Sequence, residues 1–243
     1  MTRGMNRQSL NATLVVILVP CAFLVLLGII VGERELFSFI NQGISNPFLD
    51  LACVYGSPIL FATFYIFTLA NLIISRKASH FSTIITSMTT GPLSYVLGSL
   101  IKLLVERPRP FTILENVRVI GPWDTSSFSF PSTTTMLAFG LAIPVLLLNK
   151  KRQYGIVLSV SAYFMGFSVI YTGFHFPTDV AAGILLSLSI ALITSKAYDY
   201  TTKHLKTISQ KQWSSLPTAS LQASRIHFIE APTIEAQTDN HCN

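Results

Sequence analysis

The chain has 243 residues, of which 50% are hydrophobic and only 12% are charged. Soluble globular chains carry about 25% charged residues, so this composition excludes a water-soluble surface over much of the molecule. The formal net charge of +6 would suit nucleic acid, but basic residues also collect in the cytoplasmic loops of membrane proteins. The positions of the basic residues along the chain decide between the two.

Charge-free stretches predict six transmembrane helices. A hydrocarbon core of about 30 Å needs about 20 apolar residues in a helix. The expected spans are residues 10–32, 58–75, 81–104, 133–149, 154–174 and 180–197. The amphipathic segment between the first two spans, residues 33–56, is expected at the membrane interface. The sequence therefore predicts an all-α integral membrane protein.

Most lysines and arginines fall in segments that share one side of a six-span chain. These residues are Arg3, Arg7, Arg76, Lys77, Lys150, Lys151, Arg152, Lys196, Lys203, Lys206 and Lys211. The positive-inside rule makes that side cytoplasmic, so both termini are expected in the cytoplasm. The middle outward loop departs from the rule. It carries Lys102, Arg107, Arg109 and Arg118.

The end of the chain differs in composition from the rest. Residues 1–200 are predicted to form one transmembrane domain. Residues 201–243 are polar, rich in Ser, Thr and Gln, and show no apolar period. Such a segment cannot bury enough apolar surface to fold, so it is expected to be a disordered cytoplasmic tail.

The first motif that favours phosphate binding lies at the end of the third span. Lys102 is placed to extend from the last helical turn, and Pro108 and Pro110 stop the helix, which holds Arg109 on a stiffened loop. Arginine presents a planar fork to phosphate and lysine a point charge. The alternative is that both side chains simply extend from a helix end to the membrane surface.

The second motif opens the fourth span. Ser132 is a good N-cap, and the free N–H groups of a helix N-terminus attract anions. Thr133, Thr134 and Thr135 add hydroxyl donors. Taken alone, this segment is also compatible with an ordinary helix start.

The third motif lies between the fifth and sixth spans. Pro177 suits the first turn of the sixth span, and Asp179 follows His175 by four residues. An aspartate that holds one imidazole nitrogen fixes the tautomer and leaves the other nitrogen as a nucleophile. The alternative is an interfacial histidine, but an ionisable pair at membrane depth is a functional candidate by default.

Together, in this order and on one membrane face, the three motifs resemble those of the type 2 phosphatidic acid phosphatases. These membrane lipid phosphatases are related to vanadium haloperoxidases. Lys102, Arg109 and Pro110 match the family's first motif, Lys, six residues, Arg-Pro. Pro131 and Ser132 match part of its second, Pro-Ser-Gly-His. Its third is Ser-Arg, five residues, His, three residues, Asp, and is matched by Ser168, His175 and Asp179.

Two functional positions depart from the family pattern. The second-motif histidine, which protonates the leaving group in the family, is Thr134 here, and the third-motif arginine, a phosphate ligand, is Val169. The glycine of the second motif is Thr133. Loss of a general acid typically costs about 10²- to 10⁴-fold in rate. A phosphate that leaves from a lipid diphosphate needs less help than an alkoxide.

The resemblance implies a six-helix phosphatase-like bundle in a plasma or bacterial inner membrane. It implies that His175 attacks phosphorus to form a phosphohistidine, with Asp179 as its orienting residue. Lys102, Arg109, Ser132, Thr133 and Thr134 are the expected phosphate-binding residues, on the extracytoplasmic side. The expected activity is that of a lipid phosphatase or phosphotransferase acting on a diphosphate-bearing lipid, such as a polyprenyl diphosphate.

Two rival functions stay open at this point. A catalytically impaired member of the family would bind phosphorylated lipid without hydrolysing it, and a transporter or scaffold would not depend on His175. The expected partner is a membrane lipid within the bilayer. No cofactor, metal or nucleic acid is expected, because one histidine and one aspartate are too few metal ligands and neighbouring cations would repel a metal ion.

Overall fold

The computed structural model describes residues 7–75, 78–122, 128–149 and 151–214, and within these ranges it contains helices, turns and loops but no strand. By the contacts within the chain, the residues divide into two units, 1–199 and 200–243. The arrangement described below is that of the first unit, which contains every candidate site residue named above.

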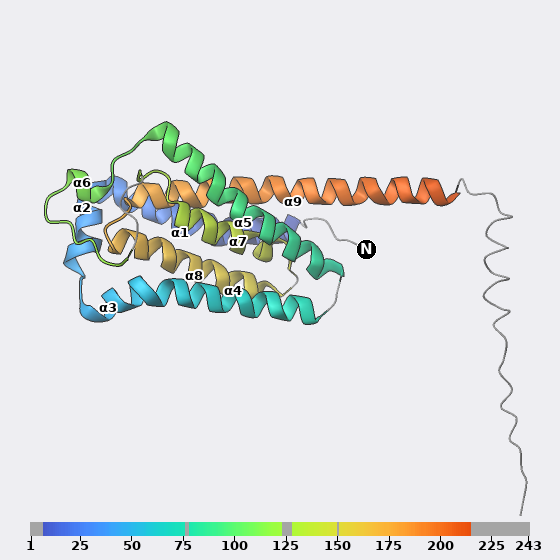
Figure 1. The fold of residues 1–243 in the computed structure, drawn as a ribbon, viewed down its shortest axis with the longest axis horizontal. Coiled ribbons are helices and arrows are strands. Elements are labelled where there is room, and N and C mark those ends of the chain that lie inside the picture. The colour runs from blue at the N-terminus through green and yellow to red at the C-terminus, as the bar shows by residue number, and fades with distance from the viewer. Residues whose placement is uncertain (1–6, 76–77, 123–127, 150, 215–243) are drawn as a thin grey trace, which may run out of the picture. The chain divides into compact units, whose positions relative to one another are not determined.

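Long helices make up the body of the first unit (Figure 1). They are α1 (Arg7–Val31), α4 (Ser57–Ile74), α5 (Ala78–Val105), α7 (Thr133–Leu148), α8 (Arg152–Tyr171) and the first part of α9 (Pro177–Ser214). Short elements connect them: α2 (Glu33–Ser38), the π-helical turn η1 (Phe39–Gly43), α3 (Pro47–Leu51), the π-helical turn η2 (Ala52–Gly56) and α6 (Pro110–Ile113). Figure 1 shows α2, α3 and α6 at the same end of the bundle.

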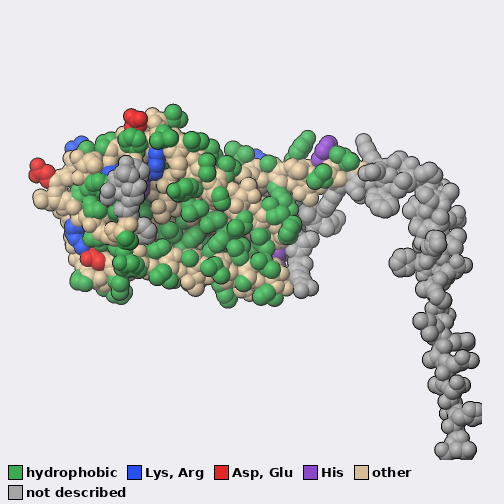
Figure 2. All heavy atoms as spheres, viewed as in Figure 1, with side chains coloured by type: hydrophobic (Ala, Val, Ile, Leu, Met, Phe, Trp, Pro, Cys, Tyr) green, Lys and Arg blue, Asp and Glu red, His purple; other side chains and the backbone are tan. Residues whose placement is uncertain are grey.

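Five helical segments of the described residues are long and apolar enough to cross a membrane. They are Arg7–Val31, Pro47–Ile74, His80–Ile113, Arg152–Tyr171 and Pro177–Leu205. Hydrophobic side chains cover the helices on the face drawn in Figure 2, and charged side chains gather near the end that carries the short helices. Ile29 is 73% exposed and Leu104 is 84% exposed. A surface of this composition needs lipid around it, so the chain is an integral membrane protein.

Helix α7 lies at the centre of the bundle. Its 16 residues are shorter than the other candidate spans, and at about 1.5 Å per residue they extend about 24 Å. Eleven of its residues are buried, and it packs against both α5 and α8. A helix that is apolar all round is one that other helices surround. The segment expected as the fourth span is therefore the inner helix of the unit.

Small residues bring α5 and α7 into close contact. A Cβ atom added at Gly140 would lie 2.8 Å from Ser94 Oγ, 2.9 Å from Gly91 Cα and 3.0 Å from Thr90 O. Backbone atoms of a neighbouring helix cannot move aside easily, so only glycine allows this approach. Such contacts are typical of helix association in membranes, where small residues replace the hydrophobic effect as the basis of packing.

The last helix extends beyond the span predicted for it. Helix α9 continues to Ser214, so the prediction of a disordered tail from Thr201 is wrong for residues 201–214. The physical reason is that no proline or glycine lies between Gly183 and Pro217, and lysine, leucine and glutamine favour a helix that has already started. The rest of the predicted tail, residues 215–243, lies outside the described residues.

Replacement of Gly140 by alanine tests the α5–α7 contact. We expect Gly140→Ala to lower the free energy of unfolding by about 1–3 kcal/mol, since overpacking forces the helices apart. Thermal unfolding in detergent measures the effect. Gly28→Ala on α1 is the matched control, because its added Cβ would meet only Leu36 Cδ2, at 3.9 Å. Equal melting temperatures for the two variants would contradict the packing account.

Candidate active site

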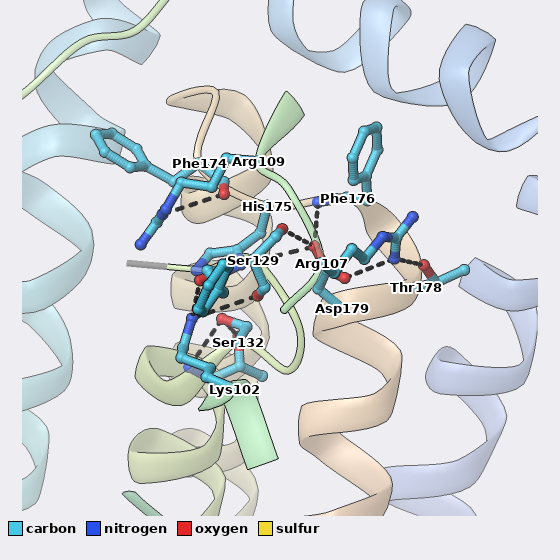
Figure 3. A network of polar contacts seen from close by, with 12 residues as sticks. Lys102, Arg107, Arg109, Ser129, Ser132, Phe174, His175, Phe176, Thr178 and Asp179 are labelled. Atoms are coloured by element: carbon cyan, nitrogen blue, oxygen red, sulfur yellow. Dashed lines mark hydrogen bonds and ion pairs between the residues drawn. The ribbon is translucent and has the colours of Figure 1, made fainter. Parts of the chain in front are cut away.

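Three segments that are far apart in sequence meet at the end of the bundle (Figure 3). The end of α5 and the loop after it supply Lys102, Arg107 and Arg109. The residues before α7 supply Ser129 and Ser132, and the connection between α8 and α9 leads to His175 and Asp179. The structure therefore brings together the three motifs that the sequence analysis singled out.

A cavity of about 210 Å³ opens among these segments. Four of the predicted site residues line it: Arg109, Thr133, Thr134 and His175. The other lining residues are Cys53, Ser57, Pro58, Met165, Ser168, Val169, Thr172 and Phe174. The two positions that depart from the family pattern, Thr134 and Val169, thus face the same space as the candidate nucleophile.

His175 is almost completely buried, with 4% of its surface exposed. The chain turns into its position at Gly173, which has a φ of 92°, and its own N–H donates to Val169 O at 3.1 Å. Burial lowers the pKa of His175 to about 4, with Asp179 acting in the opposite direction. The imidazole is therefore neutral near pH 7, which is the form that can act as a nucleophile.

Asp179 lies beside His175 without a hydrogen bond to it. Asp179 Oδ2 is 3.7 Å from His175 Nδ1, which is longer than a hydrogen bond. The carboxylate accepts instead from other groups: Oδ1 from the Arg107 guanidinium at 2.6 Å, and Oδ2 from Phe176 N at 2.8 Å and from the Ser129 hydroxyl. The bond to Phe176 N is the N-terminal cap of α9, made by its third residue.

Two of the predicted phosphate ligands, Lys102 and Ser132, form hydrogen bonds with other groups of the protein. Lys102 is buried, and its ammonium group donates to Phe128 O at 2.5 Å and to Ser129 O at 3.4 Å. Ser132 is the N-cap of α7, and its hydroxyl accepts from Thr135 Oγ1 at 2.9 Å. Neither side chain is among those that line the cavity. In this structure they hold the segment that carries Thr133 and Thr134.

Arg109 is the basic residue of the motif that reaches the cavity. It forms the N-cap of α6, with Pro110 in the first helical position. Its guanidinium donates to Phe174 O at 3.2 Å, and its Cζ lies 5.4 Å from the centre of the Phe174 ring. Only 6% of its surface is exposed. The guanidinium is thus held against the residue that directly precedes His175.

Arg118, in the loop after α6, has a purely structural environment. Its guanidinium donates to both carboxylate oxygens of Asp50, at 2.9 and 2.8 Å. Buried Asn41 accepts from Arg118 N and donates to Arg118 O and to Tyr171 O. These bonds fasten the loop after α6 to η1, α3 and α8, and they account for one of the cations that the positive-inside rule left unexplained.

Part of the cavity wall comes from residues before α5 that no sequence motif indicated. Cys53 and Ser57 come from η2 and the start of α4, and Ser57 Oγ lies 2.9 Å from Ser168 Oγ. The break in the apolar pattern at Gly56, Ser57 and Pro58 was the available signal.

The described lining residues include no carboxylate and no histidine besides His175. Two acidic residues of the loop after α5 that could in principle replace the missing general acid, Glu106 and Glu115, are exposed and lie outside the lining. Asp124, a third candidate, lies outside the described residues. In the described part of the chain, no group of three or more His, Cys, Asp or Glu side chains is placed to hold a metal ion.

Known proteins resemble this chain in sequence and in fold. The chain is 32% identical over 119 residues to the "Bacitracin transport permease protein BcrC" of Bacillus licheniformis, a match that covers 49% of this chain and 57% of that protein, less than two thirds of its length. It is 29% identical over 161 residues to "Undecaprenyl-diphosphatase BcrC" of Bacillus subtilis strain 168, with 65% of this chain and 80% of that protein covered.

A solved structure supports the fold. The transmembrane PAP2 type phosphatidylglycerolphosphate phosphatase of Bacillus subtilis is similar with a TM-score of 0.50 and 21% identity, over 74% of this chain and 94% of that one. The model of the family described as "PAP2 superfamily" matches residues 80–203, half of the chain. That segment includes all the predicted site residues, and the chain is a member of the PAP2 superfamily of membrane phosphatases.

Proposed function

We propose that this protein is a membrane lipid phosphatase or phosphotransferase that acts on a diphosphate-bearing lipid through a phosphohistidine. The observation that carries the proposal is the cavity in which neutral His175, Arg109 and the helix N-terminus at Thr133 and Thr134 face one another. A nucleophile, a fixed cation and free N–H donors within one space are what phosphoryl transfer requires. The relative named for undecaprenyl diphosphate supports the substrate class.

The first step is an in-line attack on the terminal phosphorus. His175 Nδ1 faces Asp179, so Nε2 is the nitrogen that forms the N–P bond as the bridging P–O bond breaks. The electron pair of that bond leaves with the lipid monophosphate. Arg109 stabilises the charge that builds on the phosphoryl oxygens, as preorganised donors do in a water-poor site. A water molecule then hydrolyses the N–P bond and releases phosphate, or a lipid hydroxyl accepts the phosphoryl group.

The leaving group determines which substrates this cavity can process. Thr134 cannot donate a proton near neutral pH, and the described lining offers no carboxylic acid in its place. A lipid alkoxide that leaves without a proton donor is strongly disfavoured, whereas a lipid monophosphate leaves as a weak base. The cavity therefore favours diphosphates over monoesters. The alternative function is binding of phosphorylated lipid without hydrolysis. Val169, at a position where the family has arginine, is the residue that raises it, but the relatives named as phosphatases do not favour it.

Turnover of two lipids by the purified full-length protein tests this proposal. We expect a polyprenyl diphosphate to be hydrolysed with a kcat/KM at least about 10²-fold above that for phosphatidic acid, because a missing general acid costs about that much for a basic leaving group. Thr134→His should raise turnover of phosphatidic acid by about 10²-fold, and Thr134→Val is the matched control. Faster turnover of phosphatidic acid than of diphosphate by the unaltered protein would contradict the substrate class.

His175→Ala separates the enzyme from the binding protein. In the proposed enzyme it abolishes phosphate release from the diphosphate. A protein that retains lipid in a binding assay but releases no phosphate, with or without His175, would instead be the non-catalytic member of the family.

The proposal includes an orientation in the membrane. If α7 also crosses the membrane, in addition to the five longer helices, the chain has six crossings and both termini lie on the same side. Most basic residues lie in the loops on that side, so it is cytoplasmic and the cavity opens on the extracytoplasmic side. Residues 1–200 form the phosphatase domain, and the segment after them extends into the cytoplasm. This places the site where it meets lipid head groups of the outer leaflet.

Single cysteines test the orientation in intact cells. In a chain without its native cysteines, Glu115→Cys, in the loop after α6, should react with a membrane-impermeant maleimide added from outside. Gln153→Cys, in the first turn of α8, should react only after the membrane is permeabilised. Both side chains are exposed in the structure. The reverse pattern would place the site on the cytoplasmic side, and labelling of both from outside would contradict the span count.

A further inference from the structure

Arg107 forms several contacts beside the site, although no sequence motif gives it a role. Its guanidinium donates to Asp179 Oδ1 at 2.6 Å, to Thr178 Oγ1 at 2.7 Å and to Glu33 Oε2 at 2.8 Å. Its Cζ also lies 4.5 Å from the centre of the Phe176 ring. Figure 3 shows Arg107 on the side of Asp179 away from Lys102. The family's first motif takes Arg109 as its cation and leaves Arg107 without a role.

The Asp179 carboxylate needs such a partner. Its side chain is completely buried, and a buried charge is tolerated only when it is paired and hydrogen-bonded. Arg107 is the cation that bonds to Oδ1, while the groups that donate to Oδ2, Phe176 N and the Ser129 hydroxyl, are neutral. The oxygen nearer to His175 thus has neutral partners, and the charge is compensated at the other oxygen.

Glu33 holds Arg107 from the opposite side. It lies at the start of α2 and accepts from Arg107 and from Thr178 N and Oγ1. The family match begins at residue 80, so Glu33 belongs to a part of this chain that the match does not include. The junction of α1 and α2 is thereby connected to the first turn of α9, beside the candidate nucleophile.

We propose that Arg107 is a positioning residue: braced by Glu33, it fixes the Asp179 carboxylate and thereby sets the charge that His175 experiences. The inference rests on the proposed function, in which His175 is the nucleophile. Arg107 does not line the cavity, so its effect on catalysis passes through Asp179.

The sign of the effect follows from the groups around His175. Asp179 on α9 favours the protonated imidazole, whereas the positive charges of Lys102 on α5 and Arg109 before α6 oppose it. Cys53, from η2, is a further titratable residue that lines the same cavity. Arg107 stands behind Asp179 and offsets its charge. Without Arg107 the carboxylate attracts a proton to His175 more strongly. The pKa of His175, held at about 4 by burial, should then rise.

Two readouts on the full-length protein in detergent test the inference. The first is the acid limb of kcat/KM for a polyprenyl diphosphate, which should lie near pH 4 in the unaltered protein and move up by about one unit in Arg107→Gln, the low end of the effect of a neighbouring charge. The second is the NMR titration of labelled histidine, with the His175 signal assigned by its loss in His175→Ala. This readout needs no activity.

Matched variants separate positioning from a general loss of structure. Arg107→Lys keeps the positive charge, so the pKa of His175 should stay close to its value in the unaltered protein. Glu33→Gln removes a negative charge near the site, so the pKa of His175 should fall or stay unchanged. Arg118→Gln breaks a similar arginine–carboxylate pair, with Asp50, and should leave the titration of His175 unchanged.

An unchanged His175 titration in Arg107→Gln would overturn the inference, as would an equal rise in Arg118→Gln. Failure of the proposed function looks different. In that case the unaltered protein releases no phosphate from the diphosphate, while the NMR titration still reports whether Arg107 controls His175.

Discussion

The buried carboxylate of Asp179 is the group around which the site is assembled. It accepts from Arg107 before α6, from Ser129 before α7 and from Phe176 at the start of α9, and its backbone carbonyl accepts from Ser132 N at 3.1 Å. Each partner comes from one of the three motif segments. Because a buried charge left without partners would be strongly destabilising, these segments must come together when the helices pack.

The basic residues between the last turn of α5 and the start of α7 have two kinds of environment. Arg107 and Arg118 are paired with carboxylates, and Lys102 binds backbone carbonyls. Of these four basic residues of the described loop, Arg109 alone is among the residues that line the cavity. The site therefore presents one fixed guanidinium, several hydroxyl groups and a neutral histidine to its ligand. A substrate that carries its own good leaving group suits this inventory, since the described residues that line the cavity include no carboxylic acid next to Thr134.

Much of the architecture could be predicted from the sequence, because charge-free stretches mark lipid-facing helices and the spacing of charged residues marks the loops. The helices α1, α4, α5, α7 and α8 begin and end within three residues of their expected bounds. The end of α9 could not be predicted, because a polar helix and a polar disordered tail have similar composition. The motif residues Arg109, Thr133, Thr134 and His175 do share a cavity. The hydrogen bond from Lys102 to Phe128 O depends on loop conformation, which the spacing of residues in the sequence does not reveal. Ser57 and Cys53 escaped prediction because sequence spacing does not show which residues face one another across a helix bundle; Ser57, for example, bonds to Ser168, 111 residues away.

In the proposed reaction the phosphoryl group passes through His175. Rapid quenching of the purified protein with a polyprenyl diphosphate labelled on its terminal phosphate tests it most directly. We expect an acid-labile, base-stable phosphate on the peptide that contains His175, formed before free phosphate appears and absent in His175→Ala. Turnover with no labelled protein at any time, or label on a different residue, would contradict it.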